Sequence, residues 1–179
     1  VKQAREAGAK SFSLEVLQKN TVAQRLYASA GLQRQRDLRL LQWKRDSDSS
    51  QEKRLEPLAI QPVNMPEVIS NFYRLHSVSP AWQRDLPSLV LESNLLQLAY
   101  TLQGKLQGYI LFTAKGDIVR IYDLAANDID VAKSFLLGLQ SRYKEIYSIN
   151  EPTDSPVTAA YDNCNFLEYD RQYELGMAL

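Results

Sequence analysis

The stretch that decides the fold is SLEVLQKNTVAQRLYASAGL at residues 13–32. Residues 12–17 form a short, imperfectly alternating apolar run that is typical of a β-strand. The Asn-Thr pair at residues 20–21 follows, and either residue type caps a helix by accepting hydrogen bonds from amide groups that lack a partner. The apolar residues that recur after it at helical spacing are Val22, Ala23, Leu26 and Ala30. Gly31 ends this helix, because glycine accepts the left-handed conformation found at helix ends.

This arrangement resembles the last third of a domain of the GNAT family of acyl-CoA-dependent N-acetyltransferases. The residues that match the family pattern in type and spacing are Leu14, Val16, Asn20, Ala23, Leu26, Tyr27 and Gly31, with Leu32 in place of the usual Phe. The resemblance covers about residues 1–45. It implies an α+β fold with a mixed, mostly antiparallel sheet flanked by helices. It also implies transfer of an acetyl group from acetyl-CoA, the co-substrate, to an amine.

The same resemblance assigns roles to two side chains. Tyr27 takes the position of the general acid that protonates the CoA thiolate, and Asn20 takes the position where a side-chain amide contacts the cofactor. A phenol suits the first role because it keeps its proton at neutral pH. The alternative is that Asn20 only caps a helix and that Tyr27 only packs.

A polar, charged and Ser-rich segment divides the chain. Residues 46–56 have no apolar face to bury, so they cannot offset the entropy lost on ordering, and Pro57 closes the segment. We therefore expect the C-terminal part of a first GNAT domain at residues 1–45, a linker at 46–57 and a second GNAT-like domain at 58–179. Because position 1 is Val and not Met, we also expect the chain to be a fragment, a processed product or the output of an unusual start.

The second domain is predicted to run strand, two helices, three antiparallel strands, helix, strand, helix, strand, which is the element order of a complete GNAT domain. The strand at 145–149 should pair in parallel with the strand at 118–124, because a helix connects them. Two patterns predict buried faces. The residues expected to be buried are Ile69, Phe72, Tyr73 and His76 on a helix, and Leu96, Leu98, Tyr100 and Leu102 on a strand.

The two ends of the chain are similar to each other. A shift of 134 residues, the distance from Tyr27 to Tyr161, also places Gly31 on Asn165 and Leu32 on Phe166. Leu41 falls on Leu175 in the same shift. This internal similarity predicts a tandem GNAT chain.

The phosphate-binding loop of the family is altered in the second domain. The family loop reads Q/R-x-x-G-x-G/A, whereas residues 124–130 read LAANDID, without glycine and with carboxylates at Asp128 and Asp130. A helix N-terminus attracts a charge by roughly 0.3–1 kcal/mol. Each carboxylate opposes a nearby phosphate charge by about 1 kcal/mol even at the dielectric constant of bulk water. We therefore expect this domain to lack acyl-CoA binding, and Tyr161, which occupies the general-acid position there, to have a structural role more readily than a catalytic one.

The remaining features exclude several functions. Net charge is zero, with 21 basic and 21 acidic residues, so no nucleic-acid partner is expected. The single cysteine, Cys164, suits a reducing cytoplasm and is expected to pack, and no apolar run reaches the roughly 20 residues that span a bilayer. His76 is the only histidine, and no metal site is expected. The aromatic residues that would flank an amine-substrate cleft in the family are Trp82, Tyr73 and Phe72, although packing is their commoner use.

Two functions follow from these patterns. The parent protein is expected to be an N-acetyltransferase acting on a small-molecule or peptide amine, with this chain alone inactive. The alternative is a non-catalytic GNAT-fold module for substrate recognition, domain stabilisation or dimerisation. Residues 1–45 lack the rest of their sheet, so they should dock on the second domain, pair with another copy in a homodimer, or stay mobile. The homodimer is the favoured expectation, and sedimentation showing only monomer would count against it.

Overall fold

The computed structural model describes residues 1–45 and 58–179, and the linker expected at 46–57 lies outside the described residues. The elements of the N-terminal unit, residues 1–45, are α1 (Lys2–Glu6), β1 (Ser11–Leu17), α2 (Thr21–Ser29) and β2 (Gln33–Lys44). The first elements of the C-terminal unit, residues 58–179, are β3 (Ile60–Pro62), α3 (Met65–Leu75), the 3-10 helix η1 (Trp82–Arg84) and α4 (Leu86–Leu89). The later ones are β4 (Leu96–Leu102), β5 (Lys105–Lys115), β6 (Ile118–Ala126), α5 (Ile129–Arg142), β7 (Glu145–Pro152), α6 (Thr158–Asn163) and β8 (Leu167–Ala178).

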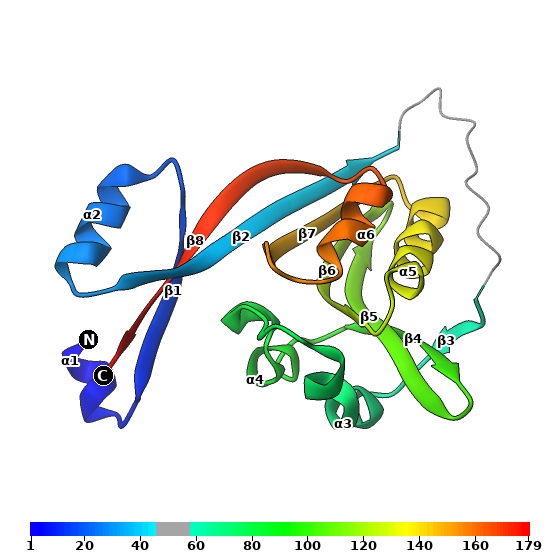
Figure 1. Ribbon diagram of the computed structural model, residues 1–179, viewed down its shortest axis with the longest axis horizontal. Coiled ribbons are helices and arrows are strands. Elements are labelled where there is room, and N and C mark those ends of the chain that lie inside the picture. The colour runs from blue at the N-terminus through cyan, green and yellow to red at the C-terminus, as the bar shows by residue number, and fades with distance from the viewer. Residues whose placement is uncertain (46–57) are drawn as a thin grey trace.

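Both units share one eight-stranded sheet, in the order β1-β8-β2-β7-β6-β5-β4-β3 (Figure 1). Every neighbouring pair is antiparallel except β6 and β7, which are parallel, so the predicted crossover is confirmed. Helices α5 and α6 cover one face, where Ile110 and Phe112 of β5 are buried. Helices α3 and α4 cover the other face, where Tyr109 and Leu111 are buried. This is the predicted α+β fold with a mixed, mostly antiparallel sheet.

The two units exchange strands. The last strand of the C-terminal unit, β8, lies between β1 and β2 of the N-terminal unit. In turn β2 lies between β7 and β8 of the C-terminal unit. Figure 1 shows β2 and β8 running side by side as a long arm between the two units. Residues 1–45 are therefore docked on the rest of the chain by pairing, which is one of the three arrangements expected from the sequence.

The exchange follows the internal similarity of the sequence. In the β2–β8 register Leu38 faces Gln172, and these two positions are 134 residues apart. The two outermost pairs, Gln33 with Gly176 and Gln42 with Leu167, are related by the same shift. Residue 33 corresponds to residue 167 and residue 42 to residue 176, so the shift turns one pair into the other. The register irregularities of this pair, at Arg34/Arg36 and Leu40/Leu41, are also related in this way. The pairing is therefore self-complementary about a local two-fold axis.

The helix ends repeat as well. Gly31 has a φ of 93° and the equivalent Asn165 a φ of 59°. The amide of Leu32 donates to the carbonyl of Tyr27 at 3.0 Å, and that of Phe166 donates to Tyr161 at 3.0 Å. Glycine and asparagine are the residue types that best tolerate a positive φ, which explains why the two helix ends have the same conformation although their residues differ.

Three predicted faces differ from the structure. On α3 the buried residues are Val68, Phe72 and Leu75, whereas Ile69 and Tyr73 are 42% and 69% exposed. The prediction was wrong for Ile69 and Tyr73 because α3 packs with the face centred on Phe72, so that Val68 and Leu75 complete the contact. On β4 the prediction was wrong for the two ends of the expected face. Leu96 and Leu102 are 46% and 51% exposed, whereas Leu98 and Tyr100 pack against one core. Ala99, on the opposite face, is buried. Because both faces of β4 are covered along its middle, alternation does not mark an inside and an outside.

On α2, the residues placed on one apolar face do not form a buried stripe. Val22 is 77% exposed and Leu26 is 64% exposed, while Ala23 and Tyr27 pack against the small core of Val16, Leu32 and Leu175. None of the helices in the described ranges is both long and apolar enough to cross a membrane.

Candidate functional site

The most unusual chemistry lies where β6 and β7 separate. These strands pair only from Ile118 to Ile121, opposite Glu145 to Ser148. Beyond that point β6 continues along β5 to Ala126, while β7 continues along β2. The two strands therefore leave a gap between them, which side chains must fill.

Arg84 fills this gap from the end of η1. Its side chain is only 3% exposed. Its Nη1 donates to a carboxylate oxygen of Glu151 on β7, and its Nη2 lies 3.5 Å from Oδ1 of Asp123 on β6. The segment before it is anchored too, since the Arg84 amide donates to the carbonyl of Ala81 at 2.7 Å. One guanidinium thus joins the two strands that the backbone leaves apart.

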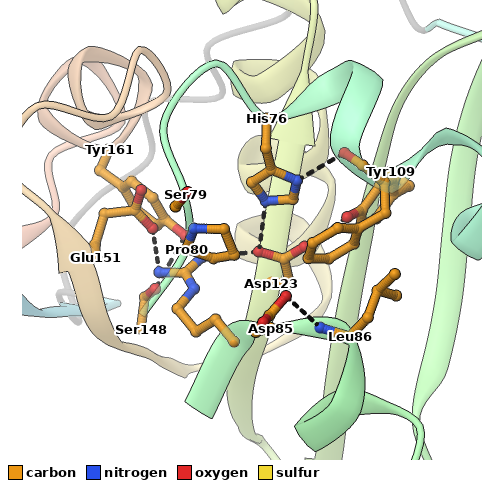
Figure 2. A network of polar contacts seen from close by, with 12 residues as sticks. His76, Ser79, Pro80, Asp85, Leu86, Tyr109, Asp123, Ser148, Glu151 and Tyr161 are labelled. Atoms are coloured by element: carbon orange, nitrogen blue, oxygen red, sulfur yellow. Dashed lines mark hydrogen bonds and ion pairs between the residues drawn. The ribbon is translucent and has the colours of Figure 1, made fainter. Parts of the chain in front are cut away.

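Asp123 collects further partners on the other side of the gap (Figure 2). Tyr109 donates its hydroxyl to Oδ2 of Asp123 at 2.6 Å. His76 places Nε2 3.3 Å from Oδ1 of Asp123 and donates through Nδ1 to the carbonyl of Phe72 at 2.9 Å. Asp123 is only 1% exposed, so all of these contacts form away from water. A buried carboxylate with this many donors is held as an anion.

Tyr161 closes the opposite side of the network. Its side chain is fully buried, and its hydroxyl lies 3.0 Å from Oγ of Ser148. Its ring packs edge-on against Phe166 at 5.1 Å between centroids. The assignment of Tyr161 to the general-acid position stays a prediction, and its observed contacts are those of a core residue.

The pKa values follow from burial and charge. Burial raises the pKa of Asp123, but the neighbouring His76 and Arg84 charges lower it by more, so the net pKa lies below its ordinary value. Burial lowers the pKa of Arg84, and the Glu151 and Asp123 carboxylates raise it by more. Burial raises the pKa of the Tyr109 and Tyr161 hydroxyls, and the nearby carboxylates raise it further. Both tyrosines therefore stay protonated, as hydrogen-bond donors.

His76 gives the network a dependence on pH. Burial lowers the pKa of His76, but the Asp123 carboxylate raises it by more, so the net pKa is above its ordinary value. Nδ1 must carry a proton to donate to a carbonyl, and a neutral ring would then turn a lone pair on Nε2 toward the carboxylate. The protonated ring is therefore the form that fits this site. The positive charge of Arg84 lowers the pKa of His76, but by less than the Asp123 carboxylate raises it.

We expect His76 to stabilise the fold most at low pH. A pKa that rises on folding adds stability fully below the unfolded value of about 6.5, and that stability is lost as pH rises through the folded pKa. His76→Gln keeps a donor but removes the charge. In urea titrations at a series of pH values, the stability difference between the wild-type protein and this variant should shrink as pH increases above about 6.5. A difference that stays constant with pH would show that His76 is neutral throughout.

The N-terminus of α5 is where the family resemblance would place the diphosphate of acetyl-CoA. Here the carboxylate of Asp128 accepts from the amide of Asp130 at 2.6 Å and so occupies one of the unpaired amides. Asp130 adds a second carboxylate, paired with Lys133 at 2.8 Å. Two carboxylates therefore lie where the resemblance would place the diphosphate.

The predicted residues of the N-terminal unit lie on α2. Asn20 caps the helix, accepting from the amide of Ala23 at 3.1 Å through its Oδ1, which leaves its Nδ2 without a protein partner in the described ranges. Tyr27 is half-buried beside Val16 and Leu175, and its hydroxyl has no hydrogen bond among the described residues. The structure keeps these two side chains apart from the Arg84 network, and their assignment as cofactor-binding and catalytic residues stays a prediction.

The other residues singled out from the sequence are distributed between core and surface. Phe72 is buried, Tyr73 is exposed, and Trp82 is 47% exposed on η1. Cys164 is buried, as expected. Within residues 1–45 and 58–179, no cluster of His, Cys, Asp and Glu could hold a metal ion.

The sequence reasoning missed Arg84, Asp123 and Glu151. Asp123 had a usable signal, because it interrupts the otherwise apolar end of β6, and an acidic residue in a central strand needs a partner. Arg84 had none, since it follows a Ser-Pro segment that is typical of a loop.

No protein-family model matches the sequence, and a search of curated proteins gives no match. Solved structures do match. A GCN5-related N-acetyltransferase from Anabaena variabilis has a TM-score of 0.66 and 16% identity, over 98% of this chain and 47% of that one. One from Sphaerobacter thermophilus has a TM-score of 0.65 and 13% identity, over 98% of this chain and 64% of that one. A tandem GNAT protein from the clavulanic acid biosynthesis pathway has a TM-score of 0.60 and 12% identity, over 99% of this chain and 66% of that one.

At these identities the likeness shows the fold alone, and that fold is the one of GNAT acetyltransferases. The chain spans about half to two thirds of the length of these three proteins.

Proposed function

We propose that the C-terminal unit is a non-acetylating GNAT-fold module that completes the sheet of an N-acetyltransferase unit to which residues 1–45 belong. The observation that supports this proposal most strongly is the position of β8 between β1 and β2. Without β8, the two strands of the N-terminal unit would have no hydrogen-bonded contact with each other. The C-terminal unit therefore acts as a structural partner, which is the stabilising role among the alternatives considered from the sequence.

The loss of acyl-CoA binding in this module is supported by energetics. Moving Arg84 aside would leave Asp123 and Glu151 as buried, uncompensated charges, and breaking a buried pair in this way costs about 3–5 kcal/mol. The attraction of a helix N-terminus for phosphate is only roughly 0.3–1 kcal/mol. The cost exceeds the gain, so acetyl-CoA is not expected to open the gap.

Acetyl transfer is proposed for the N-terminal unit. Acetyl-CoA would supply the activated acetyl group, and the acceptor would be a small-molecule or peptide amine. Asn20 offers an uncommitted side-chain N–H at the start of α2, and Tyr27 offers a hydroxyl about two helical turns further on. A phenol that keeps its proton at neutral pH can donate it to a leaving group. The tandem arrangement and a cytoplasmic location belong to the same proposal.

Calorimetric titration of acetyl-CoA into the 179-residue protein tests the proposed division of roles. We expect no saturable binding at micromolar concentrations, because the end of α5 and the β6–β7 gap are both closed and residues 1–45 do not include the phosphate-binding loop of the family pattern. The double variant Asp128→Asn/Asp130→Asn is a useful comparison, since it removes the two carboxylates but keeps Arg84 in place. Stoichiometric micromolar binding by the wild-type protein would contradict the proposal.

A further inference from the structure

Two carboxylates face each other across the outer strands of the sheet. Glu15 on β1 is directly opposite Glu174 on β8, so both side chains project from the same face. This is the face away from α2, because the alternate residues Leu14, Val16 and Leu175 pack with that helix in the small core of the N-terminal unit. Like charges directly opposite each other destabilise a strand pair, so this position needs a compensating group.

The strand exchange itself does not require two acids at this position. The 134-residue shift relates Glu15 to Ile149 and Glu174 to Leu40. Leu40 is buried and Ile149 is half-buried, so two apolar side chains take the equivalent place on the other side of the local two-fold axis. The carboxyl pair is therefore specific to the junction of β1 and β8.

Arg36 on β2 compensates one of the two carboxylates. Its Nε donates to Oε2 of Glu174 at 2.5 Å, and Glu174 is only 8% exposed. The two Nη atoms donate to the carbonyls of Ser79 and Pro80, the second at 2.8 Å. Residues 79–84, which we call the strap, lead from these carbonyls to the buried Arg84. Arg36 thus ties Glu174 to the strap and is engaged at all three nitrogens.

Glu15 has no cation of its own. Within residues 1–45 and 58–179 it forms no ion pair, and its Oε2 accepts from Nε2 of Gln83, in the strap, at a long 3.4 Å. Its Oε1 is buried and has no hydrogen-bond partner among the described residues. An ionised carboxylate accepts hydrogen bonds at both oxygens, whereas a protonated one becomes a donor itself. The acceptor that the strand register places opposite is Glu174.

The groups on the neighbouring elements favour a proton on Glu15. Burial raises the pKa of Glu15 by more than a hydrogen bond from the Trp82 indole lowers it, and the charge of Glu174 raises it further. Two other cations on the packed elements are already neutralised, Arg84 by its two buried carboxylates and Lys19 by a carboxylate of β8. The net pKa of Glu15 therefore lies above its ordinary value.

We propose that Glu15 and Glu174 share one proton and form a pH-sensitive latch that holds β1 against β8 and the strap. With the proton bound, the pair is a carboxyl–carboxylate hydrogen bond with one negative charge, which Arg36 balances. When water takes the proton, two carboxylates face each other beside a single guanidinium, and β1 is held less tightly. The latch rests on the strand exchange and not on acetyl transfer.

The direction of the effect follows from a pKa that rises on folding. The stabilisation of β1 by the bound proton is complete below the ordinary Glu15 pKa of 4.5 and is lost as pH rises through the raised value. His76 changes stability in the same direction, but it contacts Asp123 in the C-terminal unit. A measurement made on β1 itself therefore separates the two groups.

The carboxyl carbons of the two glutamates report the proton directly. In the 179-residue protein labelled with ¹³C-glutamate, Glu15→Gln and Glu174→Gln assign the two signals. We expect the Glu15 signal to move at a pH above 4.5 and the Glu174 signal to respond in the same step, because the two groups titrate as a pair. In Glu174→Gln the Glu15 signal should move at a lower pH, since the opposing charge is gone.

Hydrogen exchange across residues 11–17 measures the hold on β1. After correction for the intrinsic rate, protection in the wild-type protein should fall as pH rises through the step seen for Glu15. Glu15→Gln keeps the shape of the side chain and removes its charge, so it should abolish this fall and protect β1 about two- to fivefold more than the wild-type protein at pH 7. Glu6→Gln, at an exposed position of α1, changes net charge equally and should leave the profile of the wild-type protein unaltered.

Two results would overturn the inference. One is a Glu15 signal that moves at or below pH 4.5, which would mean that water reaches Oε1 and that the carboxylate stays ionised. The other is protection of β1 that follows the same pH dependence in the wild-type protein and in Glu15→Gln. Neither measurement involves acetyl-CoA, so a failure here is distinguishable from a failure of the proposed function.

Discussion

Replacing Arg84 by methionine is expected to lower the free energy of unfolding by about 3–5 kcal/mol. Methionine fills a similar volume, so the loss comes from charge rather than from a cavity. The substitution leaves Asp123 and Glu151, which are 1% exposed each, without the cation that compensates them. Urea denaturation followed by circular dichroism measures the change.

Two further variants isolate the cause of that loss. Arg142→Met removes an exposed guanidinium at the end of α5 and should change stability by no more than about 0.5 kcal/mol. Adding Glu151→Gln to Arg84→Met removes one of the two uncompensated buried charges and should restore part of the lost stability. A loss below about 1 kcal/mol for Arg84→Met would mean that water reaches the carboxylates and that the gap between β6 and β7 is open.

The substitution of Leu175 by proline is expected to release β1 as well as β8. Leu175 pairs with Leu14 on β1 and with Arg34 on β2, and it is 6% exposed in the small core of the N-terminal unit. Proline removes the amide hydrogen and restricts the backbone inside a strand that has neighbours on both sides. Hydrogen exchange should therefore become fast across residues 11–17, while β4 and β5 stay protected.

Leu175→Ala is the matched control for this change. It removes the same apolar contact but keeps the amide, so it should cost about 2–5 kcal/mol without selectively releasing β1. The proline variant should cost at least about 1 kcal/mol more, because it also leaves a ladder group unpaired. Equal exchange profiles for the two variants would indicate that β1 does not depend on the β8 ladder.

Local features of this fold could be predicted from the sequence because local chemistry determines them. The internal similarity placed Gly31 on Asn165, and in the structure both helix ends have positive φ and the same hydrogen bond. The helix between β6 and β7 predicted their parallel pairing. Either Asn20 or Thr21 was expected as the cap, and the side chain of Asn20 does cap α2.

Non-local features could not be predicted in this way. A strand pattern indicates that β8 is a strand but not which strands lie beside it, so the exchange was open until the pairing was known. The buried faces of α3 and β4 depend on two separate cores, and a single periodicity cannot describe an element such as β4 that touches both. The Arg84 network joins residues far apart in sequence, and only the gap between β6 and β7 brings them together.

The account depends most on the central position of β8, and nuclear Overhauser contacts between α-protons test it directly. In antiparallel strands, residues of a non-hydrogen-bonded pair have Cα atoms about 4.5 Å apart, which gives strong contacts between their α-protons. We predict that alternate residues of β8 show such contacts to β1 on one side, near Val16, and to β2 on the other, near Asp37. Contacts from β8 to β7 in place of these would contradict the exchange, and with it the proposal that the C-terminal unit completes the sheet of the N-terminal one.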